Sequence, residues 1–288
     1  MPKGVSRRLQ LPGGHLPLGG ATLIMGVVNV TPDSFSDGGH FLAREAAVAQ
    51  GLRLAGEGAN ILDVGGESTR PGSDPTPLAE ELDRVLPVVR ELKKRCNAAV
   101  SIDTYKAEVA EAAIAAGADM VNDVTALAGD PQMAGLCARS RVGLVLMHML
   151  GTPRTMQQNP HYDDVVAEVA GFLAAQAQAA LAAGVAPEAI VVDPGIGFGK
   201  TVEHNLELIR NLPALARLGY PVLLGASRKA FIGKLTGREK PAERLWGTLG
   251  VHVLGAALGA DIVRVHDVAP LKEALLVADA VMAARVAP

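Results

Sequence analysis

The sequence contains few aromatic residues and little net charge. The first feature limits the composition of the core, and the second limits the kinds of binding partner. Aromatic residues make up only 3% of the 288 residues, so the core has to be built from the aliphatic side chains that dominate its 49% hydrophobic content. The formal net charge is −3, which gives no sign of a surface for nucleic acid or for an anionic membrane. We therefore expect no nucleic-acid partner and no membrane partner.

Cysteines and long hydrophobic runs are also scarce. Cys96 and Cys137 are far apart and form no CxxC pair, which argues against structural zinc and against a disulfide framework. The N-terminal MPKGVSRRLQ lacks the apolar segment of a signal peptide. The most apolar late stretch, Val251–Val265, is interrupted by polar and charged residues, so we expect no membrane span. These features favour a cytoplasmic protein.

What the sequence does contain is an alternation of aliphatic runs and amphipathic segments, the pattern of repeated β–α units. Eight strands are expected, at residues 23–29, 59–64, 98–103, 119–123, 142–148, 189–193, 221–225 and 261–266. Eight such units fit one α/β domain over residues 1–288, a (β/α)8 or TIM barrel, which uses about 250 residues. Residues 1–20 are expected to form a short β-hairpin that closes the bottom of the barrel.

A weak internal repeat supports the barrel. Gly58–Asp63, Gly117–Asn122 and Gly259–Arg264 align without gaps, and each ends in a polar side chain. Glycine in the first position suits the left-handed turn that follows a helix.

The segment from Thr76 to Arg95 carries helix start and stop signals. Thr76 is expected to be the N-cap, Pro77 the first helical residue, and Glu80 and Glu81 lie in the first turn.

Polar residues end most of the predicted strands. They are Asn29, Asp63, Asp103, Asn122, His148, Asp193, the Ser227–Lys229 group and Arg264. Because the C-terminal ends of barrel strands converge on one mouth, where catalytic residues lie, these side chains together predict an active site there.

Two loops at this mouth are candidates for contact with a ligand, although the composition of each also fits an ordinary polar loop. The loop Asn29–Gly39 contains Asp33 and Asp37 and ends in glycines, as a mobile lid would. The loop Asp63–Gly72 carries Arg70, whose guanidinium can grip an anion with two hydrogen bonds.

Two further segments suggest ligand contacts. Asp193–Thr201 resembles a phosphate loop but has Pro194 where the motif needs glycine, so nucleoside triphosphate binding is disfavoured. Its glycines are expected to let the backbone pass close to a ligand, with Phe198 available for stacking. Arg264 and His266 lie two apart on a strand and share a face, where they could hold an anion, although His266 could equally be structural.

The motifs NVTPDSFSDGG, ESTRPG, SIDT, ND, LMHMLGTPRTMQ, DPGIGFGK, GASRK and RVHD occur in this order from about Ala21 to the C-terminus. In this order and spacing the set resembles the dihydropteroate synthase family. Those TIM-barrel transferases join p-aminobenzoate to 6-hydroxymethyl-7,8-dihydropterin pyrophosphate in folate biosynthesis, release pyrophosphate, are the target of sulfonamides and commonly form homodimers.

The resemblance implies a role for each motif residue. The pterin would contact Asp103, Asn122, Met147, Asp193, Phe198, Gly225 and Lys229. The pyrophosphate would contact Asn29, Thr31, Arg70, Arg264 and His266, with Mg²⁺ on Asn29 and the phosphate oxygens. The p-aminobenzoate would contact Thr69, Pro71, Phe198 and Lys229. The catalytic group would comprise Asn29, Asp37, Arg70, Lys229, Arg264 and His266.

An arylamine is already a neutral nucleophile at pH 7, so the chemistry needs a stabilised leaving group more than a base. We therefore expect a dissociative, SN1-like displacement. One departure from the family is Ala230, where serine is frequent. A hydroxyl contact to the carboxylate of p-aminobenzoate would then be missing.

Three alternatives remain open. The pterin-binding barrel of corrinoid-dependent methyltransferases shares the pterin-reading residues, but the SFSDGG and SRK motifs and the absence of a cobalamin domain argue against it. A barrel that only binds a ligand or partner would not need the full set of strand-end groups. A Schiff-base aldolase would use Lys229, but such lysines need desolvation, and acidic partners are expected beside this one.

Overall fold

A computed structural model describes residues 7–30 and 39–284, and for 39–42 only the backbone. Eight parallel strands form one sheet in the order β8-β7-β6-β5-β4-β3-β10-β9. They are β3 (Leu23–Asn29), β4 (Ile61–Gly65), β5 (Ala99–Asp103), β6 (Met120–Asp123), β7 (Gly143–Met147), β8 (Ile190–Asp193), β9 (Leu223–Leu224) and β10 (Ile262–Val265). A bridge between Val192 and Val222 joins the two edges, which confirms the predicted barrel.

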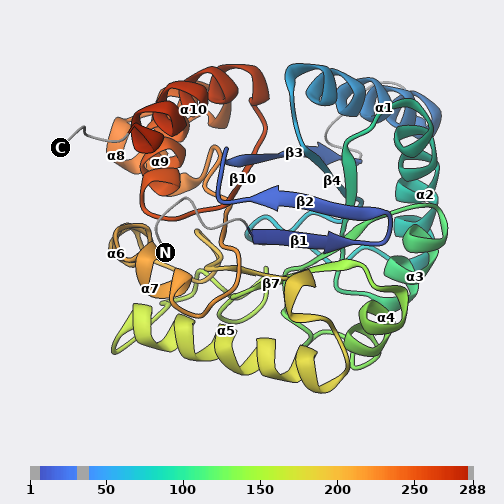
Figure 1. The fold of residues 1–288 in the computed structure, drawn as a ribbon, viewed down its shortest axis with the longest axis horizontal. Coiled ribbons are helices and arrows are strands. Elements are labelled where there is room, and N and C mark those ends of the chain that lie inside the picture. Colours follow the sequence, from blue (N-terminus) through green and yellow to red (C-terminus); the bar gives the residue numbers. More distant parts are fainter. Residues whose placement is uncertain (1–6, 31–38, 285–288) are drawn as a thin grey trace.

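The helices surround this barrel (Figure 1). They are α1 (Gly39–Glu57), α2 (Leu78–Arg95), α3 (Ala107–Ala115), α4 (Met133–Ser140), α5 (Val165–Ala182), α6 (Val202–Arg210), α7 (Leu212–Ala216), α8 (Ala230–Thr236), α9 (Leu245–Ala257) and α10 (Val268–Ala283). Short 3-10 helices occupy Pro187–Ala189 and Pro241–Arg244. The larger apolar core, built mainly from Val, Leu, Ile and Ala, joins the strands to the helices.

The predicted hairpin closes the bottom of the barrel. Strands β1 (Arg7–Leu11) and β2 (Gly14–Leu18) pair antiparallel, and Figure 1 shows them lying across the ring of helices. Leu9 and Leu18 pack into a separate apolar cluster with residues from all eight barrel strands. Those residues are Leu23, Met25, Ile61, Ala99, Met120, Val145, Val191, Leu223 and Ile262. The hairpin therefore seals the end of the barrel opposite the predicted site.

The internal repeat has the predicted conformational cause. Gly58, Gly117 and Gly259 have φ values of +106°, +110° and +110°, each just before a strand. An L side chain is strained in this region, which explains glycine at the start of all three repeats.

Two expectations need correction. Helix α2 begins one residue later than predicted: Pro77 takes the N-cap position, without a side-chain cap hydrogen bond, and Thr76 is not the cap. The Thr76 amide instead donates to Glu67 (3.0 Å). Helix α5 is long and apolar enough to cross a membrane by length and composition, contrary to the expectation that no segment is. Its buried face, including Val169 and Leu173, packs in the barrel's apolar core, as a core helix of the same composition would.

Candidate active site

Four strand-end side chains form one hydrogen-bonded cluster inside the barrel mouth. Arg264 of β10 donates from Nε to Asp63 Oδ2 (2.6 Å) and from Nη2 to Asp103 Oδ2 (2.8 Å). Asn122 of β6 donates from Nδ2 to the same Asp63 oxygen (3.0 Å). Asp63 is fully buried, and the positive guanidinium compensates the two carboxylates around it. The predicted convergence of these residues is confirmed.

Asn122 keeps an unused acceptor. Its Oδ1 atom is buried without a hydrogen-bond partner among the residues the structure describes, as are Asp63 Oδ1 and Ser101 Oγ. Because a carboxylate can only accept, the Asp63 contact fixes the amide with Nδ2 toward Asp63 and leaves Oδ1 available as an acceptor. Buried polar atoms are costly when unpaired, so a ligand with an N–H group at this point would gain affinity.

Asp193 lies at the end of β8 and is held by its own loop. Its Oδ1 atom accepts the Gly195 N–H (2.7 Å). Burial raises the pKa of Asp193 to about 6, against the opposing effects of the Gly195 hydrogen bond and the nearby cations. Burial likewise raises the pKa of Asp103 to about 7, although Arg264 lowers it. Both carboxylates are therefore poised for a ligand that supplies hydrogen-bond donors.

Lys229 faces the same region and lies against an aromatic ring. Its Nζ atom is 3.8 Å from the centroid of the Phe198 ring. Removal from water lowers the pKa of Lys229 to about 8, helped by Arg264 and opposed by Asp193 and Asp103. The sequence argument that acidic neighbours would prevent such a shift was wrong, so desolvation alone does not exclude Schiff-base chemistry.

The loop after β8 needs glycine because its backbone packs closely against the loop that follows β7. A Cβ atom on Gly195, whose φ is +64°, would lie 1.9 Å from the His148 carbonyl oxygen, and one on Gly199 would lie 2.6 Å from that of Leu150. At these two positions the expected close approach is therefore to protein backbone. A Cβ on Gly197 would instead face a side chain of the site, at 3.1 Å from Lys229, and one on Gly195 would also lie 3.3 Å from Met147 Cγ.

His266 is close to Ser227. The Ser227 hydroxyl accepts the His266 backbone N–H (3.2 Å) and lies 3.0 Å from His266 Nδ1. Burial lowers the pKa of His266 to about 3, helped by Arg228 and Arg264. The ring is therefore neutral at pH 7, and its Nδ1 atom is the one that shares a hydrogen bond with the Ser227 hydroxyl. Arg228 forms two hydrogen bonds with Asp267 (2.9 and 2.6 Å).

The remaining predicted site residues are distributed around the mouth. Asn29 is half-buried at the end of β3, Thr69 is half-buried, and Arg70 and Pro71 are exposed on the loop after β4. Met147 and Phe198 pack in one small apolar cluster, and Gly225 follows β9 near Asp193. Ala230 opens α8. Thr31, Asp33 and Asp37 lie outside the described residues.

Sequence reasoning assigned no role to Lys200, which the structure buries. Its Nζ atom lies 3.0 Å from His148 Nδ1 and donates to the Phe198 carbonyl (2.9 Å). Burial lowers the pKa of Lys200 to about 7, and burial together with Lys200 lowers that of His148 to about 3. His148, predicted as one of the strand-end residues, thus contacts this lysine. The available signal was a lysine that ends a glycine-rich loop although the loop fails the phosphate-loop pattern.

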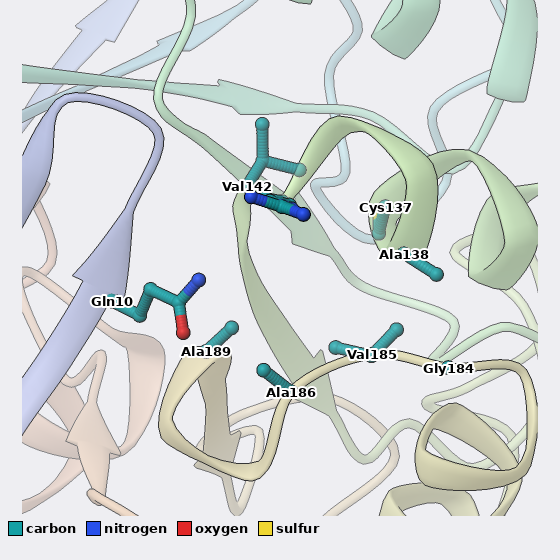
Figure 2. A pocket seen from close by; sticks show the side chains of 9 residues that line it. Gln10, Cys137, Ala138, Val142, Gly184, Val185, Ala186 and Ala189 are labelled. Carbon is teal, nitrogen blue, oxygen red and sulfur yellow. The ribbon is translucent and has the colours of Figure 1, made fainter.

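A separate pocket lies toward the opposite end of the barrel. It has a volume of about 120 Å³ and lies between β1, α4 and the segments that precede β7 and β8 (Figure 2). Its lining includes Gln10, Cys137, Val142 and Ala186. Burial raises the pKa of the Cys137 thiol to about 12, so this cysteine is not a nucleophile. The pocket is distinct from the strand-end cluster.

Comparison with known proteins agrees with this geometry. The family of pterin binding enzymes matches residues 25–266. The dihydropteroate synthase of Synechocystis sp. is 47% identical over 262 residues, 91% of each chain. The structure of Xanthomonas albilineans dihydropteroate synthase with 4-aminobenzoic acid superposes with a TM-score of 0.92 at 51% identity, covering 98% of this chain and 100% of that one. The same enzyme with 7,8-dihydropteroate gives a TM-score of 0.84 at 49% identity, covering 92% and 95%.

The barrel and its strand-end cluster thus define a pterin-binding TIM-barrel enzyme. Within that class, the chain belongs to the dihydropteroate synthase family, the transferases that form 7,8-dihydropteroate. This membership sets aside the corrinoid methyltransferase, the barrel that only binds, and the Schiff-base aldolase.

Proposed function

We propose that this chain joins p-aminobenzoate to 6-hydroxymethyl-7,8-dihydropterin pyrophosphate at the barrel mouth, by departure of pyrophosphate before the amine attacks. The observation that carries the proposal is a set of polar groups at the barrel mouth, of which Asn122 and Asp193 are buried and Asp103 and Lys229 half-buried. It combines acceptors, one ammonium group and the apolar side chains of Met147 and Phe198. This combination suits a flat, polar heterocycle.

The pterin ring is recognised by its hydrogen-bonding edge. Its exocyclic amine and adjacent ring N–H point the same way, and the Asp193 carboxylate accepts both. Asn122 Oδ1 and Asp103 accept from the remaining edge, while Lys229 donates to the ring carbonyl. Phe198 and Met147 cover the ring, and glycine at position 225 leaves space beside Asp193. Analogues that lack a donor leave a buried acceptor unpaired and are rejected.

The pyrophosphate lies toward the outer side of the mouth. Arg70 is exposed there, and the neutral His266 ring can offer Nε2–H to the anion when the Ser227 hydroxyl donates to Nδ1. Arg264 contributes charge, although its Nε and Nη2 atoms are held by Asp63 and Asp103, which leaves Nη1 for the anion. Asn29 and Thr31 complete the proposed pyrophosphate set, and Asp37 belongs to the proposed catalytic group; Thr31 and Asp37 lie outside the described residues.

Asn29 fits a Mg²⁺ ion that is held mainly by substrate. Its amide oxygen is a hard ligand at the half-buried end of β3, and the described residues contain no cluster of three or more carboxylate, histidine or cysteine ligands. Mg²⁺ commonly takes one or two protein ligands beside phosphate oxygens and water. When bound there, it would neutralise charge on the departing pyrophosphate.

The arylamine binds between the loop after β4 and the Phe198–Lys229 pair. Thr69 and Pro71 contact p-aminobenzoate from one side, and Phe198 and Lys229 from the other. Ala230 supplies no hydroxyl, so the carboxylate of p-aminobenzoate has to rely on Lys229 and on backbone N–H groups. No base is needed for an amine that is already neutral.

Incubation with both substrates and Mg²⁺ tests the reaction. We expect pyrophosphate and dihydropteroate to appear in equal amounts, and pyrophosphate alone to appear slowly when p-aminobenzoate is omitted. Absence of dihydropteroate, with the protein folded, would refute the proposed function.

Exposed apolar side chains on α9 and α10 support a homodimer. Trp246 is 78% exposed and Leu254 51% exposed on α9, and Val277 is 67% exposed on the adjacent α10. Such a patch marks an interaction surface. Sedimentation velocity should give twice the 29.7 kDa mass, and a monomer at micromolar concentration would contradict this.

We also infer a cytoplasmic location, which fits the supply of both substrates; fractionation of cells would test it.

A further inference from the structure

The loop between β4 and α2, residues 66–77, is held at its base by one side chain from another segment. Lys106 lies just after β5, at the N-cap of α3. Its Nζ atom donates to Glu67 Oε2 (2.5 Å) at the start of this β4–α2 loop and to the Thr76 carbonyl oxygen (2.7 Å) at its end. A single ammonium group therefore ties the two ends of the loop together.

The same ammonium group also contacts helix α2. It donates to Glu81 Oε2 (2.5 Å), and the Glu81 side chain is only 1% exposed. Burial lowers the pKa of Lys106, but its hydrogen bonds to Glu67 and Glu81 outweigh burial and raise the pKa above its ordinary value. Lys106 thus remains a cation between two carboxylates of low exposure, and its loss would leave those carboxylates facing each other.

The tip of the β4–α2 loop is held mainly by contacts within the loop, among them hydrogen bonds from the Ser73 hydroxyl to Ser68 O (2.5 Å) and from the Ser73 N–H to Arg70 O (3.1 Å). Arg70 and Pro71 are exposed, and the tip is held by the Ser73 hydroxyl, which donates to Arg70 O (2.7 Å), and by the Gly72 N–H, which donates to Pro153 O (3.0 Å). At the base, Arg84 adds a hydrogen bond to the Gly66 carbonyl (2.7 Å). Because most contacts of the tip lie within the loop, its position follows that of the base, apart from the Pro153 contact and an exposed ion pair between Asp74 and Arg154 (3.5 Å).

We propose that Lys106 is a positioning residue for p-aminobenzoate, which holds the β4–α2 loop so that Thr69 and Pro71 meet the arylamine. This inference rests on the proposed function. Lys106 acts through the loop, because Asp103 is held by a hydrogen bond from Arg264, and Asn122 by the one it donates to Asp63. Its one contact toward the apolar side of the pterin site is with the Tyr105 ring, whose centroid lies 5.0 Å from Nζ. Loss of Lys106 should therefore affect one substrate and spare the other.

The test compares the two substrates in Lys106→Met. Calorimetry should give a dissociation constant for dihydropterin pyrophosphate within twofold of the parent. Steady-state kinetics should give a KM for p-aminobenzoate at least tenfold higher, with a smaller loss in kcat. Lys106→Arg keeps the charge and can contact both carboxylates, so its KM for p-aminobenzoate should be close to the parent value. Lys93→Met is the matched control, because Lys93 pairs with Asp119 outside the loop (2.7 Å).

Two results would overturn the inference. One is a KM for p-aminobenzoate within twofold of the parent in Lys106→Met. The other is a parallel loss of pterin affinity, which would show general damage to the barrel mouth. If Lys106→Met does not fold, Glu67→Gln decides the question, since it removes one of the two carboxylates that hold Lys106 and should raise the KM for p-aminobenzoate while sparing pterin binding. Failure of the parent protein to bind the pterin would refute the proposed function instead.

Discussion

Asp193→Asn should weaken the binding of dihydropterin pyrophosphate by about 10- to 100-fold, the cost of an unpaired buried donor of about 1–3 kcal/mol. The Gly195 N–H donates to Asp193 Oδ1 (2.7 Å), so in the variant it would hold the amide with its oxygen toward the loop. The amide nitrogen would then face the two donors of the pterin. Isothermal titration calorimetry measures the loss directly.

Asp163→Asn is the control, because the Asp163 side chain is 98% exposed and lies away from the cluster. It should bind the pterin as the parent does. An Asp193→Asn variant that binds within twofold of the parent would show that Asp193 does not read the pterin.

The same carboxylate gives pterin binding a pH dependence. Burial raises the pKa of Asp193 to about 6 in the free protein, and only the ionised form accepts both donors. Affinity should therefore be full above that value and fall as the pH is lowered through it. Asp193→Asn should abolish this contribution, which separates it from the titration of the pyrophosphate itself.

Arg264→Met should destabilise the fold by about 3–5 kcal/mol, since it leaves two buried carboxylates without their cation. Asp63 is fully buried, and Arg264 donates to it (2.6 Å) and to Asp103 (2.8 Å). Urea unfolding followed by circular dichroism measures the change. Synthesis should also be lost, because the cluster that positions Asp103 and Asn122 would come apart.

The loss of stability in Arg264→Met should grow with pH. The pKa of Asp103 is raised to about 7 by burial, although Arg264 lowers it, so removal of the cation would raise it further. A carboxyl whose folded pKa is raised loses stability as the pH rises from its ordinary value through the raised one. The variant should therefore be less destabilised at pH 5 than at pH 8.

Two variants make this result specific. Arg139→Met removes an exposed pair with Glu111 and should cost no more than about 1 kcal/mol. Asp63→Asn combined with Arg264→Met should recover part of the stability, because it removes one of the stranded charges. If Arg264→Met alone is within 1 kcal/mol of the parent, the cluster does not depend on this cation.

The barrel could be predicted from the sequence because the patterns that indicate its strands and helices are local. Aliphatic runs locate the eight strands, and the parallel topology then brings Asp103, Asn122 and Asp193 to one mouth without knowledge of any contact. The glycines that start the three repeats have a local cause in their positive φ. Most strands are a residue or two shorter than their aliphatic runs, and the difference is largest for β9 (Leu223–Leu224), which was predicted at 221–225.

Pairings between distant side chains could not be derived in this way. Arg264 was assigned to an anion, but its reach toward Asp63, 201 residues away in sequence, depends on the register of the closed barrel. The glycines at positions 195 and 199 were assigned to a ligand, whereas they meet the backbone of the preceding loop. In the sequence Lys106 and Lys200 resemble surface lysines, because the side chains that hydrogen-bond to them come from segments that only the fold brings close to them.

The most direct test of the account is the secondary deuterium isotope effect at the pterin methylene. In the proposed function Arg70, His266 and Arg264 stabilise the departing pyrophosphate, and the arylamine, which is already a neutral nucleophile, needs no base before it attacks. The carbon–oxygen bond should therefore break first, and the methylene carbon should become planar and cationic before the amine attacks. We predict a clearly normal effect on kcat/KM for the pterin substrate. A value near unity would indicate a concerted, SN2-like displacement and would contradict the account.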